Sequence, residues 1–188
     1  MPLFQTYQSM QTHINKGNTM KLKISSIVAL VGITVLGFSV PAYSAVPYTS
    51  AALQSRLKYM VEEEKLARDV YTVLAKTAAY PRFRNIANAE QFHMDQMSMV
   101  LADYGLWNPT LNRKPGVFFN KELSTLYKTL ITKGQLSSLD AIQVGIIIEE
   151  KDIADLTAME SLITQEDIQF VVNYLKAGSI NHLAAFKR

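Results

Sequence analysis

Hydrophobic residues recur every three or four positions along four long segments of the chain, which is the spacing of helices that bury one face. Residues that typically begin or end helices bound these segments. We expect four main helices and a short one capped by Asn120, over about 51–79, 84–104, 120–134, 138–162 and 164–186. Pro81 is expected to mark a turn, and Thr164 with Asp167 to form a capping box. The last helix should continue through Gly178, since a mid-helix glycine costs only about 1 kcal/mol.

The fold class follows from this pattern. No segment shows the alternation of a β-strand, a low-complexity composition or a repeat of about 20–50 residues. Residues 45–188 are thus predicted to form one all-α domain, and the 48% of hydrophobic residues in the chain allow it a sizeable core. Two helical hairpins joined by a longer connection favour a four-helix bundle, with a short extra helix between helices 2 and 3.

Each main helix carries acidic or histidine residues in the row of positions that should face the bundle core. In the second helix, this row reads Ile86, Glu90, His93, Met97, Val100 and Tyr104. The acidic and histidine members of the four rows are Glu64, Glu90, His93, Glu149, Asp152 and His182. Burying one unpaired carboxylate is costly, so four of them together predict compensating positive charge in the core.

These residue types point to a metal centre. Four carboxylates and two imidazoles form the ligand set of a carboxylate-bridged dinuclear iron or manganese site, because oxygen ligands suit both metals and imidazole is compatible with them. Readings without metal stay open. Glu90 and His93 alone could be an exposed pair, residues 62–64 a solvated face, and His182 a residue that favours a helix end. The four helices could also bury a metal-free polar network.

The charge of the chain is concentrated at its start. The formal net charge is +3, but three of the 19 basic residues and none of the 16 acidic residues lie in the first 44 positions. The rest of the chain is therefore balanced, which argues against nucleic acid as a partner. The sequence has no cysteine, which excludes disulfides, cysteine-ligated iron–sulfur clusters and cysteine-based zinc sites.

The first 44 residues resemble a leader. A positive Met20-Lys-Leu-Lys start precedes an apolar run over 24–40, and Ala42 and Ser44 provide the small residues of a cleavage site. We expect residues 20–44 to be a signal peptide and residues 1–19 an upstream extension. The mature domain, 45–188, would then be exported to the periplasm or secreted. A retained membrane anchor is the alternative, although the run is short for a span.

Two motifs resemble those of known di-iron proteins. The stretch E-K-L-A-R-D-V-Y, from Glu64 to Tyr71, resembles the first helix of rubrerythrin and related ferritin-like proteins, and Glu90 with His93 matches their E-x-x-H pattern. Residues 57–186 as a whole resemble an uncharacterised bacterial ferritin-like domain family, through elements such as Y-M-x-E-E-E-K-L-A-R-D, I-E-E-x-D-I-x-D-L and N-H-L. The resemblance implies a ferritin-like four-helix bundle.

The resemblance also implies roles for the site residues. Glu64 and His93 would be terminal ligands, Glu90 a bridging carboxylate and Glu149 the ligand from the third helix. The fourth helix departs from the pattern, because Ser179 stands where its E-x-x-H glutamate belongs. Asp152, one turn after Glu149, is the expected replacement. Tyr71 is expected to pack in the core or to support the ligands from outside the metal site.

The implied activity is that of an exported di-iron protein. It would hold two iron ions, or manganese, and act as an oxidase, ferroxidase or peroxidase with O2 or peroxide as the acceptor. Two alternatives stay open: a metal-binding or sequestering protein without turnover, and a metal-free bundle that serves interactions. The expected partners are metal ions and O2 or peroxide, with a homodimer as a further option, and no membrane contact after signal cleavage.

Overall fold

The computed structural model describes residues 48–77 and 81–188, and this part of the chain is helical, without strands. Its helices are α2 (Ala51–Thr77), α3 (Pro81–Asp103), α4 (Lys121–Gly134), α5 (Ser138–Glu160) and α6 (Glu166–Phe186). None of them combines the length and the apolar character that a membrane span requires. The predicted extension, signal peptide and cleavage site lie outside the described residues.

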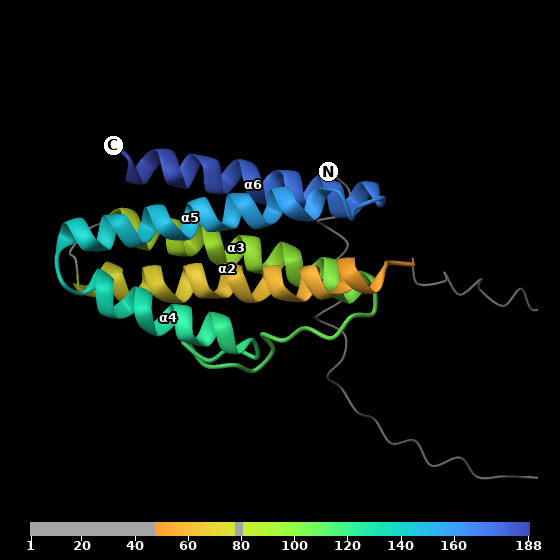
Figure 1. The fold of residues 1–188 in the computed structure, drawn as a ribbon, viewed down its shortest axis with the longest axis horizontal. Coiled ribbons are helices and arrows are strands. Elements are labelled where there is room, and N and C mark those ends of the chain that lie inside the picture. Colours follow the sequence, from red (N-terminus) through yellow and green to blue (C-terminus); the bar gives the residue numbers. More distant parts are fainter. Residues whose placement is uncertain (1–47, 78–80) are drawn as a thin grey trace, which may run out of the picture. The chain divides into compact units, whose positions relative to one another are not determined.

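The helices are arranged as two neighbouring hairpins (Figure 1). Helix α2 packs along α3, and α5 packs along α6. The hairpins meet where α2 contacts α5 and α3 contacts α6. Helix α4 lies against α2 and α5, in the connection between α3 and α5, as the sequence predicted for the short helix. The structure thus confirms the all-α class and the order of the expected helices.

Two apolar clusters fill the interior at different heights along the helices. One includes Tyr71, Phe83 and Phe186, and the other includes Met97 and Leu175. On each of the four long helices, the predicted acidic and histidine residues lie in sequence between members of the two clusters. The candidate site is therefore a polar layer with apolar packing on both sides, which limits the access of water.

Some predicted helix ends differ from the structure. Pro81 is the first residue of α3 rather than part of a preceding turn, because proline lacks the N–H that would be unpaired there. The capping box at Thr164 and Asp167 does not form: Gln165 occupies the N-cap without a side-chain bond, and Asp167 accepts a bond from Tyr104 instead. Asn120 caps α4 as predicted, and α6 continues through Gly178.

The idea that residues 62–64 form a solvated face is wrong, because all three glutamates are buried. Helix α2 packs against α3, α4 and α5, so it has three covered sides. Glu62 accepts bonds from the backbone N–H groups of Phe119 and Asn120. Glu63 accepts a bond of 2.7 Å from Lys151 Nζ. Glu64 faces the polar layer.

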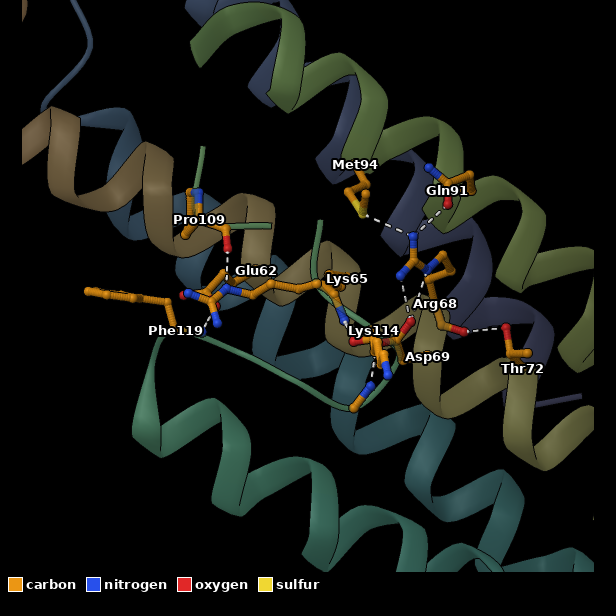
Figure 2. Close-up of polar contacts among 12 residues, drawn as sticks. Glu62, Lys65, Arg68, Asp69, Thr72, Gln91, Met94, Pro109, Lys114 and Phe119 are labelled. Carbon is orange, nitrogen blue, oxygen red and sulfur yellow. Dashed lines mark hydrogen bonds and ion pairs between the residues drawn. The ribbon is translucent and has the colours of Figure 1, made fainter. Parts of the chain in front are cut away.

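A second buried polar cluster attaches the loop after α3 to helix α2 (Figure 2). Lys65 and Asp69 are almost fully buried and form an ion pair of 2.5 Å. Lys65 Nζ also donates to the Lys114 carbonyl at 3.0 Å, and the Gly116 N–H donates to Asp69 Oδ2 at 2.9 Å. Arg68 donates to the other oxygen of Asp69. The ion pair of Lys65 and Asp69 therefore holds the loop through the backbone atoms of the loop.

Candidate metal centre

The four long helices bring the predicted site residues into one layer, and all of them except Asp152 belong to groups of donor atoms close enough to share a metal ion. Helix α2 contributes Glu64, α3 contributes Glu90 and His93, α5 contributes Glu149 and Asp152, and α6 contributes His182. The three-residue spacing of the E-x-x-H pair places both side chains on one face of α3, one turn apart. All of these residues are buried except His182, whose side chain is 14% exposed. The exposed-pair reading of Glu90 and His93 is therefore wrong.

Glu64, Glu90 and His93 form one group of donor atoms, which we call the first triad. The His93 Nδ1 atom lies 2.9 Å from Glu90 Oε2 and 3.4 Å from Glu64 Oε2. Each residue offers one ligand atom, and these atoms all lie within 4.8 Å of one another. Such a group could hold one metal ion.

Glu90, Glu149 and His182 form a second triad with the same property. The His182 Nδ1 atom lies 2.8 Å from Glu90 Oε1 and 3.6 Å from Glu149 Oε2. Glu90 belongs to both triads, and each of its oxygens faces a different histidine. The two imidazole rings are stacked, with centroids 5.5 Å apart. A carboxylate placed between two such groups has the position of a bridging ligand.

Several buried polar atoms of this layer have no hydrogen-bond partner. They include Glu64 Oε1, Glu90 Oε1, Asp152 Oδ1 and His182 Nδ1. His182 Nδ1 and Glu90 Oε1 lie 2.8 Å apart but lack the alignment of a hydrogen bond. Unpaired buried polar atoms are costly, and a cation among them would pair them. The donor set, carboxylate oxygens with two imidazole nitrogens, therefore fits iron or manganese.

Side chains around the triads hold two of the carboxylates. The Tyr71 hydroxyl donates to Glu149 Oε1 at 2.6 Å, while its ring packs against Phe186. The Ser179 hydroxyl donates to Asp152 Oδ2 at 2.5 Å. Tyr71 thus packs in the core and also contacts a site carboxylate. Reasoning from sequence did not assign the contact of Ser179, although its place in the E-x-x-H pattern marked the position as unusual.

The site carboxylates and imidazoles shift each other's proton affinity. Burial raises the pKa of Glu64 to about 8 and that of Glu149 to about 7. Burial alone would lower the pKa of His93, but hydrogen bonds with Glu64 and Glu90 raise it to about 11. Burial is likewise outweighed at Glu90, whose pKa falls to about 2 because the His182 and His93 imidazoles lie close to its two oxygens. Without a metal ion, protons compensate part of the buried negative charge.

The metal-free protein should lose stability as pH rises from about 6 to about 8. Glu64 and Glu149 keep their protons in the folded state above their ordinary pKa of 4.5, so their contribution is lost as pH rises through about 7 to 8. His93, raised from 6.5 to about 11, changes in the same direction, whereas Glu90 is ionised throughout this range.

Urea denaturation midpoints with a chelator present would measure this slope. Bound metal should reverse it, because protons compete with metal for the same atoms. A metal-free midpoint that rises with pH would contradict the assignment of raised carboxyl pKa values.

Gly178 leaves room for the His93 ring. A Cβ at this position would lie 2.6 Å from His93 Cε1 and Nε2. Helix propensity alone predicts that Gly178→Ala stabilises the protein by about 1 kcal/mol. We expect the opposite, a loss of about 1–3 kcal/mol, because the ring is held by Glu64 and Glu90 and overpacking strains it. Metal affinity should fall as well.

Denaturation and metal titration of Gly178→Ala would measure both effects. Ala177→Gly, at the exposed neighbouring position, is the matched control. It should cost about 1 kcal/mol and leave metal binding unchanged. Stabilisation by Gly178→Ala would show that His93 is not confined there.

Residues 54–188 match the family described as "Uncharacterized protein domain (DUF2202)". The chain is 46% identical over 129 residues to Uncharacterized protein MJ0754 of Methanocaldococcus jannaschii, covering 69% of this chain and 70% of that protein. Its structure is similar to the crystal structure of hypothetical protein MJ0754 from Methanococcus jannaschii, with a TM-score of 0.72, 43% identity, and coverage of 76% of this chain and 83% of that one. Since the family match spans more than half of the sequence, the chain belongs to the DUF2202 family.

Proposed function

We propose that the chain is an exported ferritin-like four-helix bundle that binds a dinuclear iron or manganese site between α2, α3, α5 and α6. The observation that carries the proposal is the position of Glu90, whose two oxygens face two different histidines within two separate triads. The export signal read at residues 20–44 supports a location in the periplasm or outside the cell.

The proposed ligands are the residues of the two triads and Asp152. Glu64 and His93 would bind one ion, Glu149 and His182 the other, and Glu90 would bridge them. Asp152 would supply the carboxylate that the E-x-x-H pattern loses at Ser179, since its Oδ1 atom is buried and has no partner. Oxygen-rich sites with imidazole favour iron and manganese over softer, thiolate-seeking metals.

The proposed activity is oxidation of Fe(II) with reduction of O2 or peroxide. Two iron ions, when bound, supply the electrons for that reduction. The chain's residues would balance the charge of the centre and orient it: Glu90 lies between the imidazoles, and the protonated Tyr71 hydroxyl donates a hydrogen bond to Glu149. The apolar clusters on both sides of the polar layer limit water.

Oxygen uptake on addition of Fe(II) tests the activity. A Clark electrode would follow O2 after Fe(II) is added to the metal-free chain in air. We expect uptake well above the rate of Fe(II) in buffer, and a return to the buffer rate in Glu90→Ala. Iron binding without accelerated uptake would instead identify a sequestering protein. Absence of iron and manganese binding would leave the metal-free interaction reading.

A further inference from the structure

The two triads differ in how many carboxylate oxygens they can use. In the first triad, Glu64 Oε1 has no hydrogen-bond partner and Glu64 Oε2 lies 3.4 Å from His93 Nδ1, so this carboxylate contacts a residue of its own triad. In the second triad, Tyr71 occupies Glu149 Oε1 with a bond of 2.6 Å, which leaves mainly Oε2. The second position therefore has fewer donor atoms from the residues that form it.

Asp152 adds to the first triad rather than to the second. Ser179, which donates to Asp152, follows Gly178 on α6, and Gly178 lies directly against the His93 ring. The Asp152 side chain therefore lies on the His93 side of the layer, next to the first triad. Ser179 holds its Oδ2 atom at 2.5 Å and leaves Oδ1 free. A metal ion at the first triad would then have Asp152 as a fourth ligand residue, beside the three residues of the triad.

The histidines of the two triads are also covered to different extents. The His93 side chain is 4% exposed; the Tyr174 ring packs edge-on against it at 6.0 Å, and Gly178 lies directly against it. The His182 side chain is 14% exposed. Solvent therefore reaches the second triad at its imidazole, while the first triad is closed on that side.

We propose that the two metal positions are unequal, with one ion held tightly by Glu64, Glu90, His93 and Asp152 and a second, exchangeable ion held by Glu90, Glu149 and His182. This inference rests on the proposed dinuclear site. The second ion would enter and leave on the side of the second triad where the His182 side chain is partly exposed to solvent.

A titration of the metal-free full chain with Mn(II) tests the inequality, with free Mn(II) followed by electron paramagnetic resonance. We expect two classes of binding that differ at least about tenfold in Kd, which corresponds to about 1.4 kcal/mol. His182→Ala should lose the weak class and keep the tight one. Asp152→Asn, which preserves the shape of the side chain, should weaken the tight class by about 10–100-fold and leave the weak class nearly unchanged.

The outcomes separate the inference from the function on which it rests. Two ions of equal affinity, or loss of both classes in His182→Ala while its circular dichroism stays helical, would overturn the inequality and leave the dinuclear site standing. An effect of Asp152→Asn confined to the weak class would also overturn it. Absence of both Mn(II) and Fe(II) binding by the wild-type chain would overturn the inequality and the dinuclear site together.

Discussion

Replacing Glu90 by alanine is expected to abolish metal binding at both positions at once. Glu90 is the residue that the two triads share, and its oxygens lie 2.9 Å from His93 Nδ1 and 2.8 Å from His182 Nδ1. Without it, each position retains one carboxylate and one imidazole of its triad. Equilibrium dialysis against Fe(II) under argon, followed by metal analysis, would measure the loss.

Two variants control for this change. Glu150→Ala removes an exposed glutamate beside Glu149 that pairs with Lys187 at 2.9 Å, and it should leave metal binding unchanged. Glu90→Gln keeps the size of the side chain but removes its charge, so it should fold and still bind at least about tenfold more weakly at both positions. Retention of one tightly bound ion in Glu90→Ala would show that Glu90 does not serve both positions.

The second large effect concerns stability and lies outside the metal centre. Asp69→Ala should destabilise the protein by about 3–5 kcal/mol, because it leaves the Lys65 ammonium buried without its counter-ion. It also removes the acceptor that holds the Gly116 N–H, so the loop after α3 should become more open to proteolysis. Urea denaturation and limited digestion would measure the two effects.

Glu160→Ala is the matched control for Asp69→Ala. Glu160 pairs with Lys176 at the protein surface, with both side chains partly exposed, so its loss should cost less than about 1 kcal/mol. Lys65→Met would remove the charge together with its need for a partner and should be milder than Asp69→Ala. Equal effects of Asp69→Ala and Glu160→Ala would contradict the assigned importance of the buried pair.

The helical pattern predicted much of the fold and the convergence of the site residues. The rows of α3 and α6 keep a regular spacing of three and four residues, which put Glu90, His93 and His182 on the core-facing rows. The structure buries Glu90 and His93 and leaves the His182 side chain 14% exposed. The burial of residues 62–64 in α2 was harder to predict, because three successive glutamates point to three different sides of a helix. An argument from periodicity assumes that a helix buries only one face, whereas other helices cover α2 on three sides. This is why all three glutamates are buried.

Contacts between distant parts of the chain were beyond sequence reasoning. The burial of Lys65 and Asp69 depends on backbone atoms of the loop at Lys114 and Gly116. No local sequence pattern predicts a hydrogen-bond partner from such a distant loop. The same holds for Gly178, whose missing side chain matters only because His93 of another helix lies there. The idea that Asp152 replaces the glutamate missing from α6 stays a prediction, supported by the bond from Ser179 to Asp152.

The most direct test of the dinuclear centre is the number of iron ions that the metal-free chain binds at equilibrium under argon. We expect about two irons per chain in the wild type, because two triads share one carboxylate, and none in Glu90→Ala. Manganese should compete for the same positions. Wild-type protein that binds neither iron nor manganese, or that binds as much as Glu90→Ala, would contradict the dinuclear centre and leave a helical core that balances its carboxylates with protons and hydrogen bonds.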